Sequence, residues 1–266
     1  MATMFVRSEV LNLRSAPVVS DETELAKLDL NQSVETSGVV DGAGWIRASA
    51  TVGGQVRAGF VKAGFLRKPA SPAVEALLAE ARTQWRRFEY GKGEEHRQPF
   101  SRMVGEMWQA IGLNLDGEDR DQPWSAAAIS FMVRNAGRRH AAYNGFAFAA
   151  AHSRYVHDAI RRRNQGDTAA PFWGFRRGER APQLGDIVCV PRAGSGVDFD
   201  HATSQNAFKS HCDIVVAIDP ANFKLLAIGG NVSHSVETTE YPLGPGNFLT
   251  GASGVFAVLA NRADEI

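Results

Sequence analysis

The sequence predicts an α+β protein of two domains, a small all-β domain at residues 1–68 and a larger domain at residues 69–266. Three observations predict this. The first part contains short β-type runs divided by turn residues, the middle contains apolar residues at helical spacing, and the last part returns to strand-like runs. Helices followed by strands within one domain are typical of helices packed on an antiparallel sheet.

Short strands separated by glycine-rich turns fill the first domain. Residues 41–44 (Asp-Gly-Ala-Gly) and 53–54 (Gly-Gly) are turn signals. Strands this short and closely spaced favour a small barrel or sandwich. The expected strands are residues 5–13, 33–40, 45–50 and 55–61.

Four helices are expected after a Pro-Ala-Ser-Pro linker at residues 69–72. Ser71 is the expected N-cap of the first helix, and Pro72 takes its first helical position. The second is expected at residues 99–111. The third begins directly after Ser125 and stops at Gly137, its expected C-terminal cap. The fourth covers residues 152–164.

Strands dominate the chain after Pro182. Residues 219–222 (Asp-Pro-Ala-Asn) indicate a hairpin turn. Residues 193–210 are rich in Gly, Ser and Asp and are expected to form a loop. The expected strands are residues 186–190, 212–218, 224–228, 232–239 and 255–260.

Composition argues against several classes of protein. Lys+Arg and Asp+Glu both number 29, so the chain lacks the basic excess expected of a nucleic-acid-binding protein. No run approaches the roughly 18 apolar residues of a membrane span. Residues 1–10 lack the basic start and apolar run of a secretory signal. Only Cys189 and Cys212 are cysteines, and we expect them to be buried strand residues rather than part of a disulfide framework.

A nucleophile, a base and an orienting group are the residues that we expect to carry chemistry. Ser125 stands at the start of an apolar helix, where free backbone N–H groups favour developing negative charge. His211 begins a strand and shares a face with Asp213, whereas Cys212 points the other way. Asn231 ends the next strand and could reach the His211 ring. This trio is the general pattern of nucleophilic catalysis.

Each of these residues also has a structural interpretation. Ser125 is an ordinary helix N-cap, and Asn231 follows two glycines in a composition typical of turns. His152 and His157 are five apart on a helix, which is poor spacing for one metal ion, so we expect neither a metal nor another cofactor. The basic residues at 161–163 and 176–177 indicate a solvated face or a contact with an acidic polymer.

The segment from residue 123 to 137 resembles the nucleophile helix of papain-like cell-wall hydrolases of the CHAP and NlpC kind. Residues 184–188 (Leu-Gly-Asp-Ile-Val), 211–216 and 229–231 (Gly-Gly-Asn) resemble their later motifs in the same order. Within this group, Ser at the nucleophile position and His-Cys-Asp at the histidine most resemble the bacterial domain-of-unknown-function family 2272. The resemblance covers about residues 70–262 and implies a papain-like fold that hydrolyses peptidoglycan amides, although serine replaces the usual cysteine.

The first domain resembles bacterial SH3-like domains. Residues 11–17 (Leu-Asn-Leu-Arg-Ser-Ala-Pro), 44–47 (Gly-Trp-Ile-Arg) and 59–61 (Gly-Phe-Val) match their opening, middle and closing motifs. Such domains often bind cell-wall peptides. The resemblance therefore implies a small SH3-like barrel in which Trp45 contacts wall peptide or packs in the core.

These observations predict a peptidoglycan amide hydrolase, either an endopeptidase or an amidase. Ser125 attacks, His211 transfers the proton, Asn231 or Asp213 orients His211, and Trp124 and Trp45 contact substrate. Two alternatives stay open: an inactive module that binds muropeptide or a protein, and an amide hydrolase acting on protein. We expect synthesis in the cytoplasm and action in the periplasm or wall, after export as an antibacterial effector or after phage lysis, with an immunity or delivery protein as partner.

Overall fold

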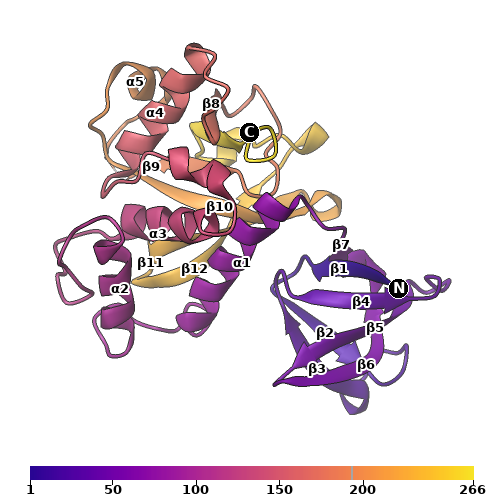
Figure 1. Cartoon of the computed structure of the whole chain (residues 1–266). Coiled ribbons are helices and arrows are strands. Elements are labelled where there is room, and N and C mark those ends of the chain that lie inside the picture. Colours follow the sequence, from indigo (N-terminus) through magenta and orange to yellow (C-terminus); the bar gives the residue numbers. More distant parts are fainter. Residues whose placement is uncertain (193) are drawn as a thin grey trace. The chain divides into compact units, whose positions relative to one another are not determined.

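The computed structural model describes residues 1–192 and 194–266 and divides the chain into two compact units, Met1–Ala70 and Ser71–Ile266 (Figure 1). The first unit holds strands and short 3₁₀ turns, and the second combines helices with an antiparallel sheet. The predicted α+β class is confirmed.

A seven-stranded antiparallel sheet forms the first unit, in the order β3-β2-β6-β5-β4-β1-β7. Its core holds the fully buried Val6, Leu13, Leu28 and Val61. The predicted single strand at residues 5–13 is wrong, because the chain bends at residues 7–9 and separates β1 from β2. The strands are β1 Ala2–Val6, β2 Val10–Arg14, β3 Glu24–Asp29, β4 Ser33–Ser37, β5 Trp45–Val52, β6 Gln55–Lys62 and β7 Leu66–Arg67. The SH3-like assignment stays a prediction.

Helices of the second unit begin as the sequence indicates. The Ser71 hydroxyl accepts a hydrogen bond from the Val74 N–H at 3.2 Å, with Pro72 in the first turn, so the predicted cap is confirmed. The helices are α1 Pro72–Arg87, α2 Phe100–Gln109, α3 Ser125–Gly137, α4 His152–Asn164 and α5 Phe199–Ser204. Helix α5 corrects the predicted loop at residues 193–210, of which residue 193 lies outside the described residues.

The second sheet has the strand order β12-β11-β10-β9-β13-β8. Its strands are β8 Phe172–Arg176, β9 Ile187–Pro191, β10 Ser210–Asp219, β11 Lys224–Val232, β12 Ser235–Pro242 and β13 Ala257–Asn261. Residues 220–222 connect β10 to β11, which confirms the predicted turn. Strand β8 was not predicted, because its alternation of aromatic residues with Gly174 precedes the segment that the sequence marks as β-rich.

Helix α3 packs closely on β11 and β10, with α1 beside it (Figure 1). Close packing depends on glycine at position 230, where an added Cβ would lie 2.3 Å from the Ala128 Cβ and 2.7 Å from the Trp124 ring. Helix α3 stops at Gly137 as predicted, but the C-cap is Arg138, in right-handed helical geometry, and not Gly137. A Cβ at residue 137 would instead meet the Asn144 side chain at 2.9 Å. These glycines fix the position of α3.

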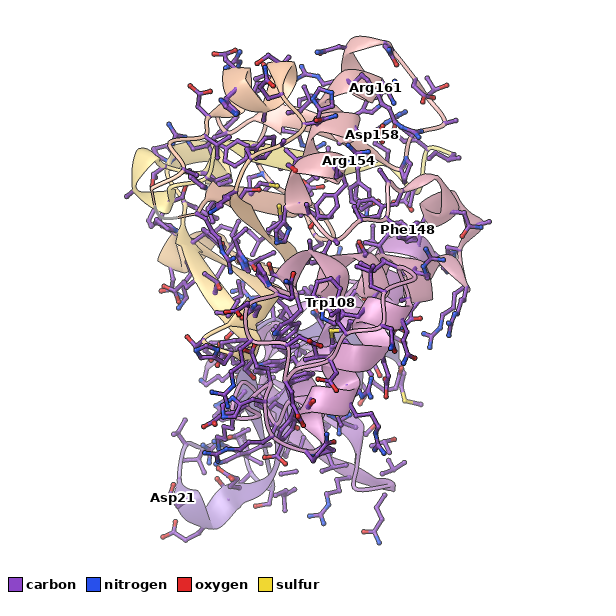
Figure 2. All side chains as sticks on the ribbon, turned by 90° about the vertical axis from the view of Figure 1, so that its left-hand side faces the viewer. Asp21, Trp108, Phe148, Arg154, Asp158 and Arg161 are labelled. Carbon is purple, nitrogen blue, oxygen red and sulfur yellow. The ribbon has the colours of Figure 1, made fainter. Side chains whose placement is uncertain are left out.

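The basic run on α4 pairs with acidic neighbours; Figure 2 labels two of these residues, Asp158 and Arg161. Arg161 and Arg162 pair with Asp158 at 2.6 and 2.8 Å, and Arg163 pairs with Glu179. These pairs favour the interpretation of a solvated face over contact with an acidic polymer. Across the part of the chain that the structure describes, no helix is both long and apolar enough to cross a membrane.

Candidate active site

A serine and a histidine from the first turns of two helices meet in the second unit. The Ser125 hydroxyl begins α3 and lies 2.7 Å from Nε2 of His152, the first residue of α4. Among the described residues, this ring takes the place that the sequence analysis assigned to His211. The predicted contact between Ser125 and His211 is therefore corrected to one between Ser125 and His152.

Ser125 is a helical residue and not the N-cap. Trp124 occupies the cap position and makes no side-chain cap, so the alternative role of Ser125 as a cap is wrong. The first backbone hydrogen bond of α3 runs from the Ala128 N–H to the Trp124 carbonyl at 2.9 Å. The N–H groups of residues 125–127 precede this bond and have no partner within the helix. They lie where the helix dipole favours a negative charge.

The serine and histidine lie at the wall of a pocket of about 580 Å³. Ser125 and His152 expose only 2% and 5% of their surfaces, so a substrate would have to enter this pocket to reach them. The volume suits a fragment of a peptide or a small ligand. The residues that line it include Ser125, Ala126, His152, Arg192, Phe208 and Lys209.

His152 is held in a chain of buried hydrogen bonds. Its Nδ1 bonds the Tyr155 hydroxyl, which bonds Cys212, and the Cys212 thiol donates to Cys189. One assignment of hydrogens satisfies every contact: Nδ1–H donates to Tyr155, and the Tyr155 O–H donates to Cys212. Nε2 of His152 is then free to accept the Ser125 proton, as a general base requires.

Burial keeps these groups uncharged. Desolvation lowers the pKa of His152 well below its ordinary value, and the nearby charges of His211 and Arg192 lower it further. Burial also raises the pKa of Tyr155 and of Cys212. The imidazole is thus neutral near pH 7, and the Cys212 thiol is protonated, which argues against Cys212 as a nucleophile.

The lowered pKa of His152 predicts a pH dependence of stability. Below about pH 6.5 the unfolded chain binds a proton at residue 152 that the folded chain does not, so folding stability falls as the pH falls. We expect the free energy of unfolding of wild type minus that of His152→Gln to decline below that pH, approaching about 1.4 kcal/mol per pH unit. Urea unfolding from pH 8 to pH 5 measures it. A difference that is constant over this range would contradict the neutral buried ring.

A second histidine lies against the first. The rings of His152 and His211 are 5.5 Å apart between centroids and inclined at 63°. His211 Nε2 bonds Asp213 Oδ1 at 2.8 Å, and Tyr241 donates to Asp213 Oδ2 at 2.6 Å. His211 and Asp213 thus share a strand face, as strand alternation predicts. Asp213 is fully buried, so these two contacts hold its carboxylate and fix the His211 ring.

Gly229 leaves the space for this pair. A Cβ at residue 229 would lie 1.7 Å from Asp213 Oδ1 and 3.1 Å from His211 Nε2. Gly229 and Gly230 pair with Glu237 and Val236 inside the sheet, so the turn composition of residues 229–231 does not make the two glycines a turn. The two glycines are positions of close approach within a strand.

Replacing Gly229 with alanine is expected to lower the free energy of unfolding by about 1–3 kcal/mol. The new methyl group would displace the buried Asp213 carboxylate from its two hydrogen bonds. Gly178→Ala is the control, since nothing lies within 4 Å of a Cβ there. Urea unfolding of both variants measures the effect. Equal stabilities of the two variants would show that Asp213 can move freely.

Asn231 does not orient His211. It has a left-handed backbone with φ 56°, at an irregularity of the β11–β12 pairing. Its side-chain amide has no hydrogen-bond partner among the described residues, whereas His211 is already bonded to Asp213. Of the two predicted orienting groups, the structure brings only Asp213 to the ring.

Trp124 is part of the core. It is 2% exposed, stacks on Phe88 with ring centroids 5.6 Å apart, and donates its indole N–H to Glu95. Glu95 also bonds His234 Nδ1 at 3.0 Å. This burial argues against the predicted contact of Trp124 with substrate. Its contacts instead fix the chain immediately before Ser125.

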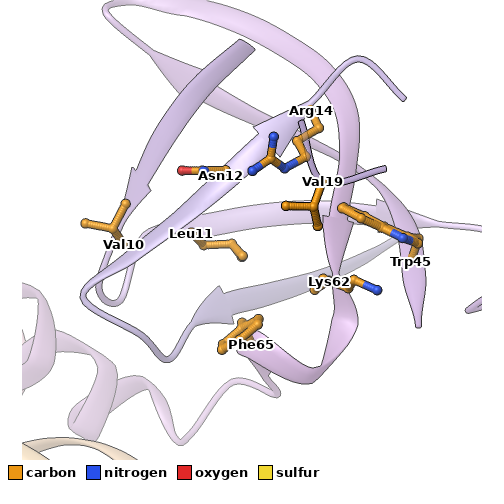
Figure 3. Close-up of a pocket in the computed structure, with 8 residues that line it drawn as sticks. All are labelled: Val10, Leu11, Asn12, Arg14, Val19, Trp45, Lys62 and Phe65. Carbon is orange, nitrogen blue, oxygen red and sulfur yellow. The ribbon is translucent and has the colours of Figure 1, made fainter. Parts of the chain in front are cut away.

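Trp45 lines a pocket of about 350 Å³ in the first unit (Figure 3). The Lys62 ammonium lies 4.5 Å from the centre of its ring, a cation–π distance. The ring itself is mostly buried. Packing and a role in lining the pocket therefore coexist at Trp45.

No group of three His, Cys, Asp or Glu side chains among the described residues is arranged to hold a metal ion.

His152 is the residue that sequence reasoning missed. It was considered only as a metal ligand with His157. The available signal was its place on the buried face of α4, together with Tyr155, Val156 and Ala159 at helical spacing. A histidine on such a face needs hydrogen-bond partners, and a tyrosine three residues later supplies one.

Comparison with known proteins gives a family for this chain. Residues 81–262 match the family described as "Uncharacterized protein conserved in bacteria (DUF2272)". The chain belongs to the DUF2272 family. The predicted family is therefore confirmed, and the DUF2272 region includes Ser125, His152, His211 and Asp213.

Two further comparisons accompany the DUF2272 match. No curated protein matches the chain. A solved structure, described as NlpC2 from Trichomonas vaginalis, is similar over 98% of this chain and 72% of its own length, with 14% identity and a TM-score of 0.29. Similarity at this level assigns no residue of the DUF2272 protein a role.

Proposed function

We propose that the second unit hydrolyses an amide bond of peptidoglycan, with Ser125 as the nucleophile and His152 as the base. The observation that carries this proposal is the 2.7 Å hydrogen bond from the Ser125 hydroxyl to a buried, neutral imidazole at the wall of a pocket. Serine cannot be stored as an alkoxide, so it needs a base in direct contact during attack.

The residues support an ordinary acyl-transfer sequence. The Ser125 oxygen attacks the carbonyl carbon while His152 Nε2 takes its proton. The N–H groups of Ser125 and Ala126, both at the pocket wall, stabilise the oxyanion. His152 returns the proton to the leaving amine, and water then hydrolyses the ester with His152 again as base. Tyr155 accepts from Nδ1 throughout and stabilises the charged ring.

Peptidoglycan as the substrate is supported by motifs of the sequence. Residues 123–137, 184–188 and 211–216 resemble those of papain-like cell-wall hydrolases, and the first unit resembles wall-binding SH3-like domains. In this proposal Trp45 and its pocket bind wall peptide. Delivery by an export system or by lysis, with an immunity or carrier protein, belongs to the same proposal.

Purified sacculi test the proposed reaction. Wild type is expected to release soluble peptides or amino sugars with new amine and carboxyl ends, which mass spectrometry of the digest would identify. The masses distinguish endopeptidase from amidase products. No excess of new ends over a Ser125→Ala sample would contradict the hydrolase.

A binding module is the second candidate, because Ser125 is 2% exposed and serine replaces the nucleophilic cysteine. In that case the pocket holds muropeptide without cleaving it. Wild type and Ser125→Ala would then bind sacculi equally and release nothing. Hydrolysis only by Ser125→Cys would indicate that the fold descends from an enzyme whose chemistry has been lost.

A further inference from the structure

Two cations stand side by side at the Ser125 pocket. The backbone N–H of Arg192 donates to the backbone carbonyl of Lys209 at 3.2 Å. This bond extends the antiparallel pairing of β9 with β10 by one residue beyond Pro191 and Ser210. Residues directly opposite each other in such a pair place their side chains on the same face. Both residues line the pocket that contains Ser125 and His152.

Neither cation forms an ion pair with a described residue. Other arginines of the second unit differ, since Arg176 pairs with Asp200 and Arg180 pairs with Asp186 at 3.2 Å. Asp121 also lines the pocket but pairs with neither cation. Arg192 is half-buried, so its guanidinium gives up part of its hydration without a protein carboxylate in return.

The positive charge of Arg192 also affects the pKa of His152, the proposed base. It is one of the causes that lower the pKa of His152, after burial and His211. An anion bound beside Arg192 would offset this effect and make His152 a stronger base while substrate is present. The positive wall and the base are thus electrostatically linked.

We propose that Arg192 and Lys209 bind a carboxylate of the substrate, so that the amide cleaved at Ser125 is one flanked by a free carboxyl group. This inference rests on the proposed function and narrows its substrate class. A planar guanidinium matches a carboxylate in two parallel hydrogen bonds, and the exposed Lys209 ammonium adds a point charge. The pocket volume of about 580 Å³ accommodates both the amide and this group.

Two synthetic peptides with the sequence of a peptidoglycan stem test the proposal. One has a free carboxyl group beside an amide bond, and the other has a carboxamide in place of that carboxyl group. Calorimetry with full-length Ser125→Ala measures binding without turnover. We expect the carboxylate peptide to bind about tenfold more tightly or better, as for a charge-assisted contact. Adding Arg192→Gln and Lys209→Gln together should bring the two affinities to within about twofold.

Arg102→Gln is the matched control, because Arg102 is an exposed cation on α2 outside the pocket, and it should leave the discrimination unchanged. Equal affinities for the two peptides, no binding of either, or discrimination that survives the double substitution would overturn the proposal. Turnover of the same peptides by wild type separates the two claims. Tighter binding of the carboxylate peptide without hydrolysis supports the carboxylate site and contradicts the hydrolase. Hydrolysis of both peptides without a difference in affinity supports the hydrolase and contradicts the carboxylate site.

Discussion

Replacing Ser125 with alanine is expected to lower the rate of amide hydrolysis by about a thousandfold or more, because the attacking oxygen is removed while the pocket remains. The measurement is the initial rate of product release from sacculi by wild type and variant. Ser101→Ala is the control, since Ser101 is a buried serine on α2 whose hydroxyl has no partner among the described residues. It should keep wild-type activity.

Ser125→Cys extends this test. A thiol at the first turn of a helix has its pKa lowered and can attack as a thiolate, so this variant should retain or regain activity. Equal rates for wild type and Ser125→Ala would contradict Ser125 as the nucleophile. Activity confined to Ser125→Cys would favour the binding module.

The second large effect is expected at His152. His152→Gln removes the base that contacts the Ser125 hydroxyl and should lower kcat/KM by about 10²- to 10⁴-fold. His211→Gln should lower kcat/KM less, because His211 contacts the His152 ring and bonds Asp213 but does not contact the Ser125 hydroxyl. The ratio of the two losses measures which imidazole takes the proton.

Circular dichroism and urea unfolding provide the control for this comparison, since both histidines hold buried partners and both variants must be shown to fold. A larger loss in His211→Gln, with both variants folded, would contradict the assignment. It would return the role of base to the residue that the sequence motifs indicate.

Local signals explain what could be predicted from the sequence. The cap at Ser71 and the apolar spacing of α3 depend on a few neighbouring residues, and both were found. The shared face of His211 and Asp213 follows from strand alternation alone. The family was predictable for the same reason, because its motifs are short segments with fixed spacing.

Tertiary contacts explain what could not be predicted. His152 meets Ser125 because α4 and α3 place their first turns together, and nothing in residues 125–152 encodes that distance locally. Gly229 and Gly230 have a turn composition, yet they stand in a strand because Asp213 and Ala128 need the space of a missing Cβ. The burial of Trp124 could not be predicted either, because its contacts with Phe88 and Glu95 come from a distant part of the chain.

Covalent labelling of the folded chain tests the activation of Ser125 most directly, without knowledge of the substrate. A serine-directed fluorophosphonate reacts with a hydroxyl that a neighbouring base deprotonates: the serine oxygen bonds to phosphorus as a phosphonate ester, and fluoride leaves. Mass spectrometry of tryptic peptides after labelling should find one adduct, on Ser125, that is lost in His152→Gln and kept in Ser101→Ala. Absence of an adduct on Ser125, or an adduct that forms equally fast without His152, would contradict the Ser125–His152 site.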